Sequence, residues 1–229
     1  MSALVQSTYF GLVLSLLAYW IGMRIREKTK LAFCHPLLIS TILIILILVF
    51  FKIDYATFNA GAQYLTYLLT PATICLALPL YREVKILKEH SSTILIALIA
   101  GCITCFVFVI GFCTLWKLDQ SMLLSLLPKS ITTAIAIDVT NEIGGISAIT
   151  VAAVIITGII SAVLANGIFK ICRIHDPIAQ GLALGASGHA IGTSKAIELG
   201  KVQAAMSSLA IVVTGILTVI AVPIIVQFL

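Results

Sequence analysis

The sequence is short of charge: only 10% of its 229 residues are Asp, Glu, Lys or Arg, while 61% are hydrophobic. A soluble domain needs more polar surface than this to cover its outside. A bilayer core about 30 Å thick needs roughly 20 apolar residues per helix, so the chain has room for several crossings and no sizeable soluble domain. The composition therefore predicts an all-α integral membrane protein and excludes soluble enzymes and nucleotide-driven pumps.

The sequence also lacks the residue groupings of common active sites. It has no Ser-His-Asp grouping, phosphate-binding loop or metal-ligand spacing. Its six cysteines lie in or beside apolar runs, without the histidines or the second pair that a zinc or haem site needs. We interpret them as small packing residues. We therefore expect no enzyme activity, no metal and no cofactor.

Six long apolar runs predict helices that span the bilayer, at residues 4–23, 36–51, 60–81, 92–116, 147–169 and 204–228. Basic residues gather in three connections, at 24–30, 82–88 and 170–173. Because cytoplasmic loops carry the excess of Lys and Arg, these connections should face the cytoplasm, which puts the N-terminus outside. We therefore attribute the net charge of +5 to the basic loops that face the cytoplasm. We expect a lipid bilayer and no nucleic acid as partner.

Two further segments, 121–146 and 177–201, do not fit this sidedness as simple spans. The helix that ends at Lys170 must run inward, so 121–146 must begin and end outside, and 177–201 must begin and end in the cytoplasm. The first is interrupted at Pro128 and the second by a run of glycines. Such backbone is stable at membrane depth only where protein buries it or it lines a cavity. We predict two broken or re-entrant hairpins; the alternative is that each segment is one tilted helix.

A short internal repeat connects these two segments. Thr133-Ala-Ile-Ala-Ile-Asp138 recurs sixty residues later as Thr193-Ser-Lys-Ala-Ile-Glu198, with the same threonine, alanine, isoleucine and terminal carboxylate. Each repeat would hold an odd number of crossings, so the second copy would lie upside down relative to the first. Inverted repeats whose broken segments meet near the midplane are typical of secondary transporters.

The distribution of polar residues predicts the domain organisation. Residues 1–60 hold almost no polar residue inside their apolar runs, whereas the repeats concentrate them. Alternating access needs one part that stays still while another moves. We predict an elevator-like architecture with a scaffold that forms a homodimer and a moving inverted-repeat unit. The scaffold would be residues 1–90, including the proline-broken segment 60–81, and the transport unit residues 91–229, with repeats at about 91–146 and 147–229.

Three blocks carry a family resemblance: TPATICLALPLY, LLPKSITTAIAIDVTNEIGGI and ICRIHDPIAQGLALGASGHAIGTSKAIELG. They resemble the signature blocks of the LrgB/CidB family, and the resemblance covers nearly the whole chain. Members are described as holin-like or antiholin-like regulators of murein hydrolases and lysis beside a smaller LrgA/CidA-type partner, and as carriers of small carboxylates. The plastid glycolate/glycerate translocator contains a similar domain. The resemblance implies the bacterial cytoplasmic (inner) membrane and supplies the substrate class.

Two basic side chains stand at matching positions of the repeats. Lys129 is costly at membrane depth unless it faces protein or water and has a partner, and a small carboxylate would be one. The alternatives are a structural ion pair with Asp138, Glu142 or Glu198, carboxylates that could otherwise serve in ion coupling, or a position near the interface. His189 could donate a hydrogen bond or carry a proton, or it could simply be packed.

Hydroxyls and glycines surround these two residues. Neutral hydroxyls would bind a 2-hydroxy acid without holding it by charge, whereas their alternative is back-bonding to helix carbonyls. Pro71 and Thr73 would line the cavity, unless Pro71 only kinks its helix. The predicted substrate-binding residues are Lys129, Ser130, Thr132, Thr133, Ser187, His189, Gly192, Thr193 and Ser194.

Two functions fit these observations. The main hypothesis is proton- or ion-coupled secondary transport of small monocarboxylates of the glycolate, glycerate, lactate or pyruvate type. The alternative is a holin/antiholin-like regulator of murein hydrolase activity and lysis that acts with an LrgA/CidA-type partner. Exact substrate, coupling ion and direction of transport are not encoded in any motif.

Overall fold

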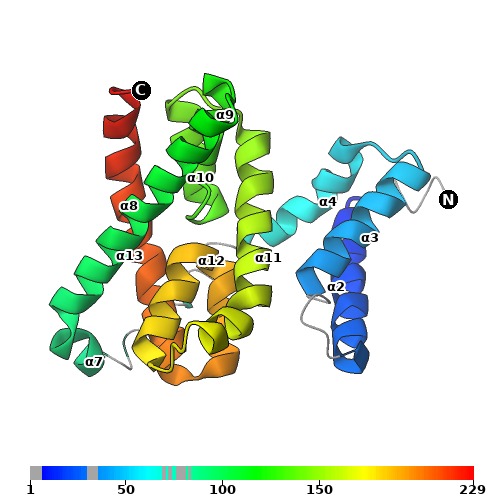
Figure 1. The fold of residues 1–229 in the computed structure, drawn as a ribbon. Helices are drawn as coiled ribbons and strands as arrows, with labels where there is room; N and C mark the ends of the chain where they lie inside the picture. Colours follow the sequence, from blue (N-terminus) through cyan, green and yellow to red (C-terminus); the bar gives the residue numbers. More distant parts are fainter. Residues whose placement is uncertain (1–6, 30–35, 69–70, 72–73, 76–80, 82–83) are drawn as a thin grey trace. The chain divides into compact units, whose positions relative to one another are not determined.

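The structure, a computed structural model, describes residues 7–29, 36–68, 71, 74–75, 81 and 84–229 (Figure 1). All regular secondary structure in this part of the chain is helical. The all-α class is thereby confirmed. The chain divides into two compact units, residues 1–75 and 76–229, and each is described by itself.

The N-terminal unit contains α2 (Phe10–Thr29), α3 (Pro36–Phe50) and α4 (Tyr55–Tyr67), with α2 packed on both others. α4 begins where the Asp54 carboxylate accepts a hydrogen bond from the Ala56 N–H at 3.1 Å. α2 and α4 approach backbone to backbone, because a side chain at Gly11 would overlap the carbonyl oxygen of Phe58. Small residues are what permit such close approach between helices in a membrane.

The helices of this unit differ in extent from the predicted spans. Helix α2 continues to Thr29, past the predicted end at 23, and α3 has 15 residues, which is about 22 Å of helix. Helix α4 ends at Tyr67, well inside the predicted run 60–81. Pro71 is exposed and helical. Thr73 lies outside the described residues, so its predicted place in a cavity stays a prediction.

The C-terminal unit holds three helices that are long and apolar enough to cross a membrane: α8 (Ser91–Leu115), α11 (Ser147–Ile171) and α13 (Lys201–Val226). A short helix, α7 (Val84–Glu89), precedes α8. These are the candidate spans found among the described residues, so the structure supports a membrane protein without reproducing all six predicted spans.

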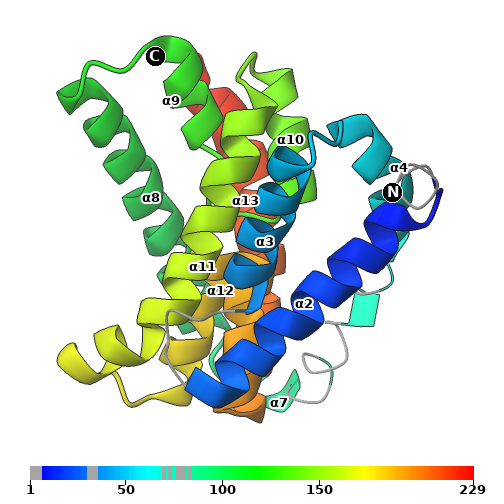
Figure 2. The same ribbon diagram turned by 90° about the vertical axis from the view of Figure 1, so that its right-hand side faces the viewer.

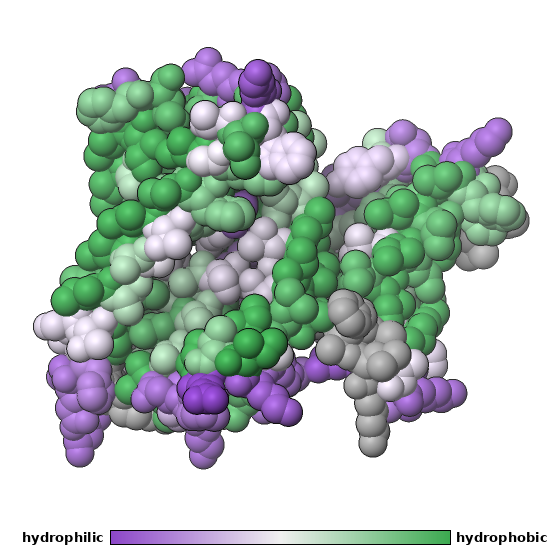
Figure 3. All heavy atoms as spheres, in the orientation of Figure 1, coloured by the Kyte–Doolittle hydropathy of each residue, from purple (hydrophilic) through white to green (hydrophobic). Residues whose placement is uncertain are grey.

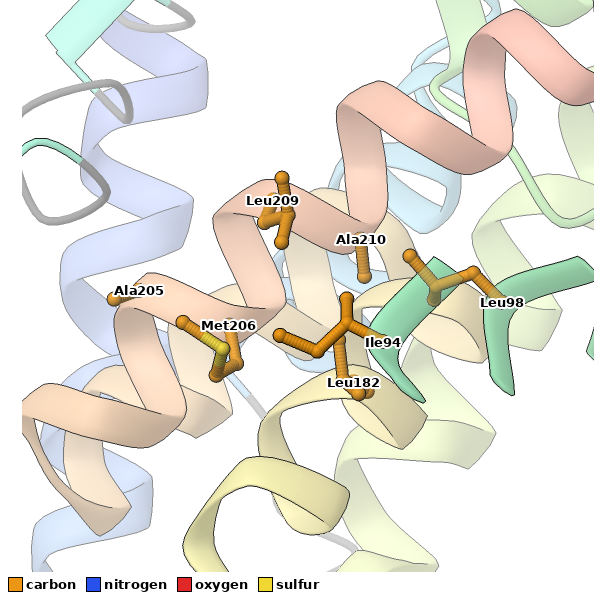
Figure 4. Close-up of a cluster of buried hydrophobic side chains, with 7 residues drawn as sticks. All are labelled: Ile94, Leu98, Leu182, Ala205, Met206, Leu209 and Ala210. Carbon is orange, nitrogen blue, oxygen red and sulfur yellow. The ribbon is translucent and has the colours of Figure 1, made fainter. Parts of the chain in front are cut away.

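Side chains of α8, α12 and α13 form one of the apolar clusters of this unit (Figure 4). Leu98 of α8 is 1% exposed, and Met206 of α13 is fully buried. On the face shown in Figure 3, hydrophilic residues gather at the two ends of this unit, with apolar residues between them. Apolar surface outside as well as inside is expected of a protein whose solvent is lipid. The cluster consists of Ile94, Leu98, Leu182, Ala205, Met206, Leu209 and Ala210.

The predicted segment 121–146 folds back on itself in a hairpin made of α9 (Gln120–Leu126) and α10 (Thr133–Glu142). Ser125 lies beside the far end of the segment, because its hydroxyl accepts a hydrogen bond from the Ile146 N–H at 2.7 Å. Its carbonyl accepts from the Thr150 hydroxyl at 2.9 Å. We call this segment the first hairpin; its tip is residues 127–132.

The predicted segment 177–201 also folds back, although it is one helix, α12 (Pro177–Leu199), by hydrogen-bond pattern. His189 has φ 40° and ψ −128°, which is not helical. A side chain at Gly192 would overlap the carbonyl oxygen of Leu184, a contact that residues eight apart in a continuous helix cannot make. We call this segment the second hairpin; its tip is at His189.

The two hairpins open toward opposite ends of the C-terminal unit (Figures 1 and 2). The first joins the end of α8 to the start of α11. Both arms of the second lie at the start of α13, where the Gln203 side chain donates to that of Gln180 at 3.2 Å. This is the arrangement that an inverted repeat requires. Re-entry into a bilayer and elevator-like movement stay predictions.

Candidate functional site

The tip of the first hairpin carries a lysine. Pro128 has no N–H with which to continue α9, so the chain leaves the helix after Leu127, and α10 begins only at Thr133. The Lys129 ammonium donates to the Ser130 hydroxyl at 3.1 Å. The Ser130 oxygen is in turn 3.3 Å from the Cys105 sulfur on α8.

Lys129 is half-buried, and no carboxylate of the described residues pairs with it. Asp138 and Glu142 are exposed on α10. Glu198 pairs with Lys195 at 2.9 Å. The structure therefore does not bring these three carboxylates to Lys129, and the alternative of a structural ion pair has no support in the part of the chain that is described.

The tip of the second hairpin carries a buried histidine. His189 is 3% exposed, and its Nε2 lies 3.0 Å from the backbone oxygen of Val154 on α11. One turn further on, Gly158 leaves room for the ring, because a Cβ there would lie 2.9 Å from Cε1 of His189. The histidine is thus fixed against α11 by a hydrogen bond and by the shape of the helix surface.

Behind this histidine, hydroxyls hold the second hairpin to the last span. The Thr193 hydroxyl lies 2.7 Å from the Ser207 hydroxyl of α13 and 2.9 Å from the His189 carbonyl oxygen. Gly192 is buried against Leu184. The predicted residues His189, Gly192 and Thr193 thus lie together. The Thr193 hydroxyl, however, already forms its hydrogen bonds with other groups of the protein.

The two tips meet at α11. Ile131 of the first tip packs in one apolar cluster with Val154, the residue whose carbonyl binds His189. Lys129 lies two residues before Ile131 in the first tip, so the tips bring Lys129 and His189 to the same stretch of α11. Residues sixty apart in the sequence, at matching positions of the repeat, are therefore brought to one place.

Two helix N-termini also begin at this place. α10 starts at Thr133, and the second arm of α12 starts after His189. The first N–H groups of a helix have no partner within it, and the helix dipole adds about half a positive charge at that end. Together with Lys129 they make the meeting point positive. An arrangement of this kind favours a small anion.

The remaining predicted residues are divided between the site and the surface. Thr132 and Thr133 are half-buried at the start of α10. Ser187 and Ser194 are exposed, and their hydroxyls bond back to Ala183 and Ala190 at 2.6 and 3.2 Å. The two serines therefore follow the alternative to substrate binding, in which the hydroxyl bonds back to a carbonyl of its own helix.

A cavity of about 20 Å³ lies beside the first tip. Sequence reasoning missed Cys105, Thr214 and Thr218, which lie on spans rather than on hairpins. The signal that could have indicated the threonines is their spacing of one helical turn inside an otherwise apolar run. The cavity is lined by Gly101, Cys102, Cys105, Phe106, Leu127, Ser130, Ala186, Thr214 and Thr218.

Comparison with known proteins places the chain among relatives. The profile of the LrgB-like family matches residues 15–228. The antiholin-like protein LrgB of Bacillus subtilis (strain 168) is 41% identical over 98% of this chain and 97% of its own. The proteins of the same name from Bacillus mycoides (strain KBAB4) and Bacillus cereus (strain B4264) are 40% and 39% identical over 98% of both chains. No solved structure matches. Because profile and relatives cover nearly its whole length, the chain belongs to the LrgB-like family.

Proposed function

We propose that this chain is a secondary transporter that moves small monocarboxylates of the glycolate, glycerate, lactate or pyruvate type. The observation that carries the proposal is Lys129, an ammonium at a hairpin tip that has no carboxylate partner among the described residues. A charge in such a position is costly unless something compensates for it. A bound carboxylate would compensate for it.

The surroundings of Lys129 support an anion that binds reversibly. Two helix N-termini add positive potential, and the hydroxyls of Ser130, Thr132 and Thr133 add neutral hydrogen-bonding groups. His189 is the titratable group beside the lysine, so we assign it the coupling role if transport is linked to protons. A site with one fixed and one titratable positive group can bind an anion and release it again.

The opposed hairpins support alternating access. The meeting point lies between two hairpins that open toward opposite ends of the C-terminal unit, so movement of the unit would expose the site to one side at a time. Residues 1–90 would be the static, dimeric scaffold. The starts of α8, α12 and α13 and the end of α11 lie at the end that carries Lys85, Lys88, Lys170 and Arg173, which we assign to the cytoplasm. The N-terminus would then lie outside a bacterial inner membrane.

Flux through purified protein tests the proposal. In liposomes that contain the protein, labelled glycolate or pyruvate should move down an imposed gradient. Lys129→Ala should abolish this flux and keep the protein folded. Lys170→Ala, which removes an exposed lysine at the end of α11, is the matched control and should retain it. Absence of flux for every acid at every pH and sodium gradient would contradict transport.

Sided labelling tests the topology by itself. In a cysteine-free background, single cysteines near Asp119 and Gly144 should both react with an impermeant reagent from outside. Cysteines near Asp176 and Lys201 should both react from the cytoplasm. Labelling of the two ends of either hairpin from opposite sides would make that segment a plain span.

The names of the relatives favour a second candidate, and they favour it more than transport. Those proteins are named antiholin-like, which fits a regulator of murein hydrolase activity and lysis that acts with an LrgA/CidA-type partner. If this candidate is right, loss of the chain should change lysis, and Lys129→Ala should leave that phenotype unchanged. A lysis phenotype that follows carboxylate flux through the Lys129 variants would instead make transport the primary activity.

A further inference from the structure

The cavity beside the first tip is lined by a threonine hydroxyl that has no hydrogen-bond partner among the described residues. Thr218 on α13 lines the cavity and is 4% exposed. No hydrogen bond joins its hydroxyl to any other residue that the structure describes. A buried hydroxyl without a hydrogen bond costs about 1–3 kcal/mol. One turn earlier, the Thr214 hydroxyl lines the same cavity but donates back to the Ala210 carbonyl at 2.7 Å.

Ser130 offers a second open position across the cavity. A hydroxyl has one donor and two acceptor positions. The Lys129 ammonium, which can only donate, uses one of them at 3.1 Å, and the Cys105 thiol uses another at 3.3 Å. One position of Ser130 therefore remains, and Ser130 lines the same cavity as Thr218.

The size of the cavity limits what can enter it. About 20 Å³ is enough for one water-sized group and too little for a whole carboxylate. The carboxylate itself belongs on Lys129, whose ammonium is one hydrogen bond away from the cavity wall. C2 is the carbon next to the carboxylate, so a group attached to it is the nearest one that could reach the cavity while the carboxylate stays on the lysine.

We propose that Thr218 and Ser130 form a specificity subsite for an oxygen on C2 of the substrate. This inference rests on the proposed transport function and names the residues that would select 2-hydroxy and 2-oxo acids over acids without that oxygen. An acid with only hydrogens at C2 leaves both open positions unsatisfied. Sites built to hydrogen-bond a substrate oxygen discriminate against the analogue that lacks it for this reason.

Competition for uptake tests the subsite. Unlabelled glycolate and acetate differ in the C2 oxygen, so each is titrated against labelled glycolate in liposomes, and the ratio of their inhibition constants is compared. We expect the wild-type protein to prefer glycolate by about 2- to 13-fold, the net value of one hydrogen bond. Thr218→Val, which replaces the hydroxyl with a methyl of the same shape, should reduce the ratio to about one by weakening glycolate alone.

Two variants control this measurement. Thr214→Val removes the neighbouring hydroxyl that already has a partner, and it should keep the wild-type ratio. Thr218→Ser restores the hydroxyl and should restore the ratio. Thermal unfolding provides a readout apart from transport: Thr218→Val should unfold at the wild-type temperature or above it, because it removes an unpaired buried hydroxyl.

The outcomes separate the subsite from the proposed function. Uptake of glycolate with no preference over acetate, or a Thr218→Val protein with the wild-type ratio, overturns the subsite and leaves transport in place. An equal loss of glycolate and acetate affinity in Thr218→Val also overturns it, because the residue then acts on packing or on a resident water. Absence of uptake of any carboxylate by the wild-type protein overturns both inferences.

Discussion

The two hairpins of the C-terminal unit have similar lengths and opposite orientations, but their tips are held in different ways. The first turns through residues 127–132, which lie between α9 and α10, and the hydrogen bond that its lysine forms within the described part of the chain goes to the adjacent Ser130. The second turns at His189, which is bound to α11, and its Thr193 is bound to α13. Buried polar groups in the second tip are satisfied inside the protein, whereas the first tip presents groups that can bind something else.

The arms of the two hairpins are also held together in different ways. The second hairpin packs its glycines directly on backbone: side chains at Gly185 and Gly192 would overlap carbonyl oxygens of Ser207 and Leu184. The arms of the first hairpin are tied by the side chain of Ser125 instead. Close-packed interiors tolerate little change of volume, so the second hairpin should act as a rigid wall and the first as the adaptable part of the site. The following predictions test this contrast.

The largest effect should come from a methyl group between the arms of the second hairpin. Gly192→Ala puts Cβ into the Leu184 carbonyl, which cannot move without opening the hairpin, so we expect a loss at the upper end of about 1–3 kcal/mol. Gly167→Ala is the control, because nothing lies near an added Cβ there. It should be neutral or slightly stabilising. Thermal unfolding in detergent measures both; equal melting temperatures would mean that the hairpin is not folded back this tightly.

Next in size is the contrast between the two tips. His189→Ala removes a packed, hydrogen-bonded ring and should cost about 2–3 kcal/mol of unfolding free energy. Lys129→Ala removes a charge that no carboxylate of the described residues pairs with, and it should leave stability unchanged or raise it. Both are measured by thermal unfolding of the purified protein. A Lys129 variant that loses as much stability as the His189 variant would make the lysine structural.

The side chain that ties the first hairpin should have an intermediate effect. Ser125→Ala leaves the Ile146 N–H without its acceptor and should cost about 1–2 kcal/mol. Ser194→Ala is the control, because that exposed hydroxyl bonds back within its own helix. It should change stability by less than about 0.5 kcal/mol. Equal, small losses would show that other contacts hold the first hairpin closed.

A smaller effect should appear as coupling between Gly158 and His189. Gly158→Ala crowds the imidazole in the wild-type protein, but not once His189 is alanine. A double-mutant cycle should therefore give a coupling of about 1 kcal/mol, with Gly158→Ala neutral or favourable in the His189→Ala background. Additive losses would mean that the glycine serves another contact, such as the one with Ile191.

The smallest effect should come from Asp138, the carboxylate at the end of the first repeat motif. It is exposed and forms no ion pair with Lys129, so Asp138→Asn should change stability by less than about 0.5 kcal/mol. Chemical unfolding of the two proteins under the same conditions measures this difference. A large loss would restore the ion-pair alternative for Lys129.

Much of the site could be predicted because its residues break the local pattern. Lys129 and His189 interrupt apolar runs at matching positions, and sidedness required both segments to turn back. The structure brings both to the meeting point. The hydroxyls were harder to assign. A Ser or Thr hydroxyl that binds a substrate and one that bonds back to a helix carbonyl look the same in the sequence. Ser187 and Ser194 proved to be exposed, and Thr193 to be bound by Ser207.

The sequence by itself determined that this is a membrane protein, the family to which it belongs, and that the two hairpin segments are interrupted. These follow from composition, from long matched blocks and from proline and glycine, which act locally. Only the tertiary structure decided that no carboxylate of the described residues pairs with Lys129, that Gly158 accommodates His189, and that Thr218 lines a cavity together with Ser130. Each of these depends on helices distant in the chain, whose packing brings together residues that no local pattern relates.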